Sequence, residues 1–135
     1  MTWFKVDDGF PDHPKVRSIT PKGRRTACIG LWLACGTWSA RHLTDGLIPE
    51  WVVLDNGILV QAGILAGSGL WHAPGHDCPR CGQPGVAEHL FHDWPDYQPT
   101  KAAVEERRRL RAEAGAKGGV QSGRTRRLRA VGEPE

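Results

Sequence analysis

The stretch WHAPGHDCPRCGQPGVAEHLFHDW, from Trp71 to Trp94, holds the residues around which this chain is organised. It carries two cysteines at Cys-x2-Cys spacing and four of the six histidines of the chain. The segments at its two ends, residues 70–72 and 89–94, alternate apolar and polar side chains, which is typical of the strands of a β-hairpin. We therefore expect a hairpin with a Cys/His loop, residues 72–92.

Two thiolates separated by two residues can bind one metal ion, because the short Pro-Arg turn between them directs both sulfurs to the same side. Zn²⁺ prefers four Cys and His ligands arranged as a tetrahedron. The nearest complete set in this stretch is His76, Cys78, Cys81 and His89, so we expect these four residues to hold a structural Zn²⁺ ion. His72 is an alternative to His76.

Two other interpretations of this stretch stay open. A turn rich in Gly and Pro can hold these residues without metal, and the second Cys pair of a zinc ribbon is missing. A thioredoxin-like redox pair requires a strand-to-helix junction, whereas Gly82, Pro84 and Gly85 follow this pair and prevent a helix from starting there. Catalytic zinc is less favoured, since Glu88 is the only candidate for a general base.

The distribution of charge divides the chain into two parts. Residues 1–99 carry 8 Lys and Arg against 10 Asp and Glu, whereas residues 100–135 carry 10 against 5. The net charge of +3 therefore combines a near-neutral folded domain with a basic C-terminal extension. Such an extension indicates a polyanionic partner, with a merely solubilising role as the simpler alternative.

The beginning of the chain gives an expectation of where the protein works. MTWFKVDDGF has acidic residues where a signal sequence needs an apolar segment, and the uncharged run of residues 27–40 is too short to cross a bilayer. Four cysteines without a signal sequence favour thiols in a reducing compartment. We expect a soluble cytoplasmic protein with no membrane partner.

Residues 24–42 give the strongest helix prediction in the chain. Ala27, Leu31, Ala34, Cys35 and Trp38 recur at helical spacing and mark one face as buried. Shorter helices are expected over residues 50–54 and 58–66, before the hairpin. Small helices followed by a terminal hairpin are the element order of a winged helix-turn-helix, so we predict an α+β, mainly α fold of that type.

The basic extension is predicted to begin with a helix. Thr100 is a suitable cap for a helix that ends near residue 116, and the Gly- and Arg-rich residues 115–129 are expected to be flexible. The candidate nucleic-acid-binding residues lie here, apart from one arginine at the hairpin tip; they are Arg80, Lys101, Arg107, Arg108, Arg109, Arg111, Lys117, Arg124, Arg126, Arg127 and Arg129.

Several phrases of the sequence together resemble one family. These are MTWFKVDDGF with HPKV (residues 13–16), LTDGLIP (residues 43–49), FHDWPDYQP (residues 91–99) and the Gly- and Arg-rich tail. They resemble small helix-turn-helix or replication-initiation-like proteins of actinobacteria and their phages. The resemblance implies a winged-helix DNA-binding protein for phage or prophage replication or transcriptional control. It also implies that His92 is structural, which leaves His76 and His89 as the better ligands.

The expected second helix of the helix-turn-helix limits what the DNA contact can be. Residues 56–69 contain no charged residue, so this segment cannot supply the usual arginine-to-guanine contacts. We expect a non-catalytic protein that binds duplex DNA mainly through phosphate contacts from its tail. The alternatives are a protein-interaction module of a replication or regulatory complex, favoured by six Trp residues, and RNA binding through the tail.

Overall fold

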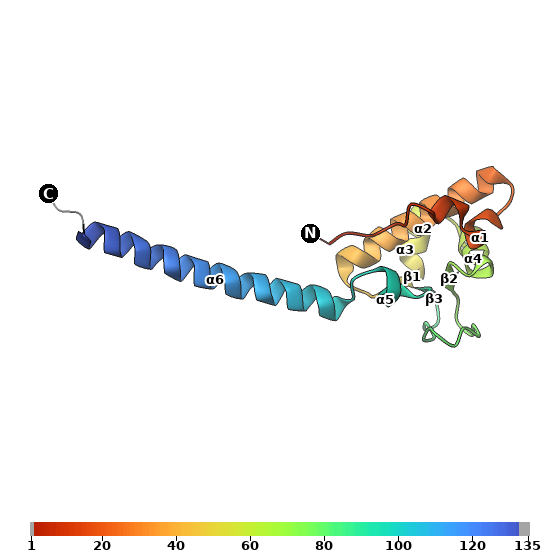
Figure 1. The fold of residues 1–135 in the computed structure, drawn as a ribbon. Helices are drawn as coiled ribbons and strands as arrows, with labels where there is room; N and C mark the ends of the chain where they lie inside the picture. The colour runs from red at the N-terminus through yellow and green to blue at the C-terminus, as the bar shows by residue number, and fades with distance from the viewer. Residues whose placement is uncertain (1, 133–135) are drawn as a thin grey trace. The chain divides into compact units, whose positions relative to one another are not determined.

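The computed structural model describes residues 2–132, with side chains for residues 2–129. The elements are η1 (Phe10–Asp12, a 3-10 helix), α1 (Pro14–Arg17), α2 (Lys22–His42), β1 (Leu47–Pro49), α3 (Glu50–Asn56), α4 (Leu59–Ser68), β2 (Trp71–His72), β3 (Glu88–Phe91), α5 (Trp94–Tyr97) and α6 (Lys101–Gly132) (Figure 1). This confirms the predicted α+β, mainly helical fold with a Cys/His group in the terminal hairpin. The chain divides into two compact units, Met1–Lys101 and Ala102–Glu135.

Helix α2 supplies the largest share of the core of the first unit. Its buried side chains include Cys28, Leu31, Trp32 and Cys35, which pack against residues of α3, α4 and the sheet. The buried face of α2 is rotated slightly from the predicted face, since Ala27 is exposed and Cys28 is buried in its place. The bulkier Trp32 ring decides the orientation, since burying it removes more apolar surface from water than burying an alanine methyl group.

The three strands form one antiparallel sheet in the order β1-β3-β2. In this register Ile48 pairs with His89, and Trp71 pairs with Phe91. Ile48, Trp71 and Phe91 are buried, so this face of the sheet covers the core. At the start of β1 the chain passes very close to β3. A Cβ atom on Gly46 (φ 88°) would lie only 3.0 Å from the Phe91 Cβ, so a glycine is required there.

Helices α3 and α4 form a bent pair next to α2. They meet at an angle of 111° across the break at Gly57 and Ile58, within the range of a helix-turn-helix. Within the described part of the chain, no single helix is long and apolar enough to cross a membrane. Helices α3 and α4 reach that length and hydropathy only when they are counted together, although a sharp bend separates them.

Helix α6 is longer than the sequence predicted. It continues past residue 116 to Gly132, through the segment that was expected to be flexible. The segment contains no proline, and its Ala, Arg, Leu and Gln residues are good helix formers, so the glycines at 115, 118, 119 and 123 do not end the helix. The basic residues of the second unit therefore lie on one continuous helix.

Candidate metal centre

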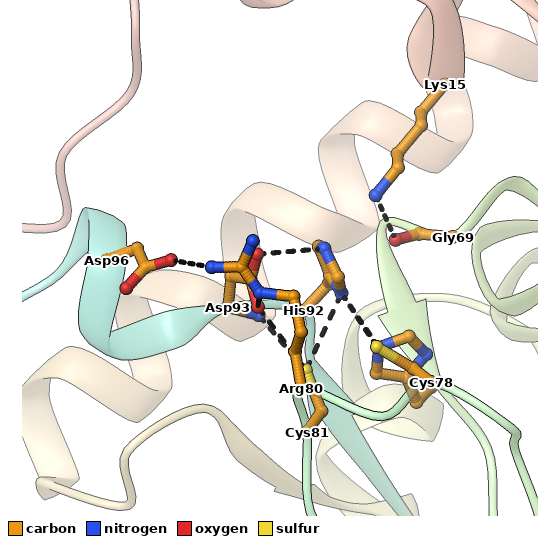
Figure 2. A network of polar contacts seen from close by, with 9 residues as sticks. Lys15, Gly69, Cys78, Arg80, Cys81, His92, Asp93 and Asp96 are labelled. Atoms are coloured by element: carbon orange, nitrogen blue, oxygen red, sulfur yellow. Dashed lines mark hydrogen bonds and ion pairs between the residues drawn. The ribbon is translucent and has the colours of Figure 1, made fainter.

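Four potential ligands meet at the base of the hairpin loop: His72, Cys78, Cys81 and His92. Each offers one ligand atom, and these four atoms all lie within 4.8 Å of one another. His72 Nε2 is 3.0 Å from His92 Nδ1, while Cys78 Sγ and Cys81 Sγ are 3.7 Å and 3.5 Å from that same nitrogen. Figure 2 shows both sulfurs directed at the His92 ring. The four residues form a candidate metal site.

The register of the sheet explains why these two histidines contribute. Side chains alternate between the two faces of a strand, and directly paired residues share a face. His72 pairs with Leu90, and His92 lies two residues beyond Leu90, so both histidines belong to the face opposite the core. The His92 amide donates to the Leu70 carbonyl at 3.2 Å, which continues the pairing as far as His92. The hairpin loop then returns the two cysteines to this outer face.

The two histidines that the sequence predicted as ligands have other contacts. His89 lies on the core face, half-buried, with its ring centroid 5.1 Å from that of Trp71. His76 supports the loop, because its Nδ1 accepts from the Cys78 amide at 3.1 Å and its Nε2 is 2.7 Å from the Gly82 carbonyl oxygen. Of the predicted set His76, Cys78, Cys81 and His89, the cluster therefore contains the cysteines only. His72 was the alternative to His76, and His92 was expected to be structural.

A second layer of charged residues surrounds His92 and Cys81 (Figure 2). Asp93 is buried, and its Oδ2 lies 3.1 Å from His92 Nε2. Its Oδ1 lies 3.3 Å from Arg80 Nε, and Arg80 also pairs with Asp96. The Asp93 amide donates to Cys81 Sγ at 3.4 Å. Arg80, expected at the tip of the hairpin as a DNA contact, is thus engaged in ion pairs beside the cluster.

The surroundings of His72 and His92 favour neutral imidazole rings, so a nitrogen of each ring can donate an electron pair to a metal ion. Burial, with smaller contributions from His76, His92 and Lys15, lowers the pKa of His72 to about 4. Burial, followed by the Lys15 ammonium, also lowers the pKa of His92. Burial raises the pKa of the Cys81 thiol. Neutral imidazoles bind metal directly, whereas the thiols must lose a proton when a metal ion binds.

Part of this cluster also has the geometry of a nucleophile, a base and an orienting carboxylate. Cys81 Sγ lies 3.5 Å from His92 Nδ1, and His92 Nε2 lies 3.1 Å from the Asp93 carboxylate. A cysteine nucleophile needs a pKa lowered towards neutrality, whereas burial raises that of Cys81. His72 Nε2 also occupies the same His92 nitrogen that would accept the thiol proton. Four converging donors match a metal centre better than a catalytic triad.

The remaining predicted nucleic-acid-binding residues lie on α6. Lys101 is its first residue, and Arg107, Arg108, Arg109 and Arg111 follow within three turns. The Arg109 guanidinium pairs with Glu106 at 2.6 Å and with Glu113 at 3.1 Å, so it is partly neutralised. The members nearer the C-terminus, Lys117, Arg124, Arg126, Arg127 and Arg129, are exposed along the same helix.

An exposed apolar surface on α3 and α4 is the feature that sequence patterns did not place. Trp51 and Leu54 of α3 are 59% and 53% exposed, and Leu59 and Val60 of α4 are 48% and 66% exposed. Ile58, between the two helices, is 55% exposed. A helix without charged residues needs apolar neighbours on most of its sides. The absence of charge over residues 56–69 was therefore the feature of the sequence that could have indicated this surface.

No known protein family, curated protein or solved structure matches this chain. The assignment of the candidate metal centre therefore rests on the identity of its four donors, on the distances between them and on the sheet register that brings them together.

Proposed function

We propose that the cluster of His72, Cys78, Cys81 and His92 binds Zn²⁺ as a structural ion. The single observation that carries this proposal is the convergence of two thiol and two imidazole donors within 4.8 Å. With metal–sulfur distances of about 2.3 Å and metal–nitrogen distances of about 2.0 Å, tetrahedral ligands lie roughly 3.3–3.8 Å apart. The observed separations from His92 Nδ1, between 3.0 Å and 3.7 Å, need only small adjustments to reach that range.

The donor set favours Zn²⁺ and a structural role. Two sulfurs and two nitrogens in a tetrahedron suit zinc, whereas Mg²⁺ and Ca²⁺ prefer oxygen ligands. Four protein ligands fill the tetrahedron, so no position remains for the water or substrate of a catalytic zinc. The 15 residues between β2 and β3 have no strand or helix of their own, and an ion at their base would hold both ends of this loop.

Metal analysis of the purified full-length protein tests the first part of the proposal. Native mass spectrometry and elemental analysis should find one zinc per chain, and Co²⁺ should replace it with the absorption spectrum of a tetrahedral site. The double variant Cys78→Ser with Cys81→Ser should contain no zinc, while Cys28→Ala should keep one. Zinc content that does not depend on Cys78 and Cys81 would contradict the site.

We further propose that the protein binds duplex DNA without catalysis. The succession α2-β1-α3-α4-β2-β3, with the sheet order β1-β3-β2, supports a winged helix-turn-helix domain whose wing is the metal-bound loop. The basic helix α6 supports phosphate contacts. Since α4 carries no charge, base recognition through it is unfavourable, and we expect weak sequence preference. The resemblance to replication-initiation-like proteins makes phage or prophage replication or transcriptional control the proposed context.

The test is fluorescence anisotropy of a labelled random duplex at several salt concentrations. Micromolar affinity that falls steeply with salt would support phosphate-driven binding. A full-length variant with Arg107, Arg108 and Arg111 changed to Gln should lose most of this affinity and keep its helical content. Competition with duplex RNA of the same length distinguishes a preference for DNA from a general affinity for polyanions.

The exposed apolar surface of α3 and α4 favours one alternative function, a protein-interaction module. Trp51, Leu54 and Val60 are each more than half exposed, and tryptophan is a frequent anchor at protein interfaces. Under this alternative, the protein would show no salt-dependent DNA affinity. Analytical ultracentrifugation would then detect an assembly that Trp51→Ser disrupts.

A further inference from the structure

Asp93 contacts the cluster without itself being a ligand, and Arg80 contacts Asp93. Asp93 reaches it in three ways: its Oδ2 lies 3.1 Å from His92 Nε2, its amide donates to Cys81 Sγ at 3.4 Å, and its Oδ1 lies 3.7 Å from that sulfur. Its side chain is 9% exposed, whereas that of Arg80 is 63% exposed. A buried carboxylate needs a specific partner, because leaving it unpaired away from water is strongly unfavourable.

We infer that Asp93 is the positioning residue of the metal centre, and that Arg80 holds the Asp93 carboxylate in place. This inference rests on the metal-binding function proposed above. His92 faces the other donors with Nδ1, so its Nε2 carries the proton and donates to Asp93. That hydrogen bond fixes both the tautomer and the rotation of the ring. It also makes Nδ1 a better electron-pair donor.

The backbone at Asp93 directs the side chain towards the cluster. Asp93 has φ 50° and ψ 40°, in the left-handed region, where the chain turns from β3 into α5. Asp and Asn adopt this conformation more readily than most residues, because their short polar side chains form local hydrogen bonds. The turn places the amide of Asp93 on Cys81 and its carboxylate on His92 at the same time.

Arg80 offsets a repulsion between two negative charges that arises when the metal ion binds. When Cys81 gives up its proton to solvent, its thiolate lies about as close to the Asp93 carboxylate as the thiol does now, 3.7 Å from Oδ1. Two negative charges at that separation repel each other. Arg80 Nε lies 3.3 Å from the same oxygen, so its positive charge offsets this repulsion. Arg80 also lies between the two cysteines in sequence, which keeps it close to both sulfur ligands. Asp96 pairs with the other side of the guanidinium.

The charge of Arg80 makes its role distinguishable from a simple repulsion of the metal ion. A cation near the centre repels a metal ion, so if that repulsion dominated the effect of Arg80, replacing it with Gln would tighten metal binding. If Arg80 holds Asp93 in place and offsets the repulsion from the thiolate, the same replacement weakens metal binding. The two roles therefore predict opposite signs for one variant.

The experiment compares Asp93→Asn and Arg80→Gln with the matched control Asp96→Asn in the full chain. Zn²⁺ dissociation constants come from competition with a chelator of known affinity. Asp93→Asn keeps the shape and the turn but loses the charge, so we expect it to bind zinc about 10–100-fold more weakly. Arg80→Gln should also weaken binding, whereas Asp96→Asn, which touches Arg80 but none of the ligands, should bind as the unaltered protein does.

The absorption spectrum of the Co²⁺-saturated protein provides a readout that a merely structural role would not change. A change in the donor strength of His92 shifts the ligand-field bands of Asp93→Asn, while a general loss of stability leaves them in place. Unchanged zinc affinity and spectrum in Asp93→Asn, or tighter binding in Arg80→Gln, would overturn the inference. Should Asp93→Asn fail to fold, the exposed Arg80 provides the deciding variant. Absence of Zn²⁺ and Co²⁺ binding in the unaltered protein would instead refute the proposed metal centre.

Discussion

His72 Nε2 and His92 Nδ1 lie 3.0 Å apart across the hairpin, although 20 positions separate the two residues in the chain. This contact exists because both residues occupy the outer face of the β2–β3 pair. Two neutral imidazoles at this distance share a single hydrogen bond, since each has one nitrogen that accepts and one that donates. A cation between them would be bound by both rings, so the contact marks where a metal ion would sit.

Replacing the histidines one at a time tests which set binds the metal. We expect His72→Ala and His92→Ala each to lose zinc, because each removes a donor from the cluster. His89→Ala should retain it, because that ring lies on the core face against Trp71. His76→Ala should retain zinc with reduced affinity, since its ring stacks on His72 and accepts from the Cys78 amide. Elemental analysis after gel filtration is the measurement.

The opposite result would support the ligand set expected from sequence. If His76→Ala and His89→Ala lose zinc while His72→Ala and His92→Ala keep it, the loop must rearrange around the metal ion. Cys78 and Cys81 belong to both sets and therefore do not distinguish them.

The spacing of the cysteines predicted two members of the cluster, whereas the spacing of the histidines did not predict the other two. Cys-x2-Cys spacing identified both sulfur donors, because two residues so close in sequence remain close in any fold. His72 lies in β2 and His92 directly follows β3, so the selection of these histidines depends on register. A shift by one residue would place His89 instead of Leu90 on the outer face. Nothing in the spacing of the histidines encodes that register. Burial of Trp71 and Phe91 on the inner face fixes it instead.

The same distinction applies to the helices. Residues 24–42 were predictable because their apolar spacing is local, and α2 spans Lys22–His42. The length of α6 was not predictable from its glycines, since each lowers helix propensity without ending a helix. The Cys35 thiol was predicted on the buried face of α2, and it is fully buried.

Thiol reactivity should divide the four cysteines into two pairs. Burial raises the pKa of Cys35 to about 12 and also raises that of Cys28, where the nearby Arg24 opposes the effect. Both are fully buried, so iodoacetamide at pH 8 should leave them unmodified in the folded protein. Cys78 and Cys81 should be protected by zinc and react after chelation, as peptide mass spectrometry would show. Modification of Cys35 without unfolding would contradict the burial described here.

His89 should make folding stability depend on pH. Burial lowers its pKa from the ordinary 6.5, although the Glu50 carboxylate opposes this effect. The unfolded chain then binds more protons than the folded one as the pH falls below 6.5. The stability due to neutral His89 is therefore complete above that pH, and it is lost as the pH falls through the lower folded pKa.

A substitution at His89 tests this linkage. Its Nδ1 is buried and has no hydrogen-bond partner within residues 2–129, which costs about 1–3 kcal/mol. His89→Leu should raise the free energy of unfolding at pH 7 by about 1 kcal/mol and flatten its decrease towards pH 5. Urea unfolding of zinc-loaded protein at several pH values measures both effects, with the exposed His42→Gln as control. An equally steep decrease in His89→Leu would assign the pH dependence to another group.

The arginines of α6 should differ in how much each contributes to DNA affinity. Each arginine that neutralises a phosphate adds about 0.9 to the slope of log affinity against log salt concentration. Before it can bind a phosphate, the Arg109 guanidinium must break its ion pairs with Glu106 and Glu113. The exposed Arg108 takes no part in those two ion pairs. We therefore expect Arg108→Gln to lower the slope by nearly one unit, about 0.9, and Arg109→Gln to lower it by less. Anisotropy titrations on one random duplex, from low to moderate salt, give both slopes. Equal decreases would mean that the ion pairs of Arg109 open freely on DNA, and no decrease in either would place the phosphate contacts elsewhere on the protein.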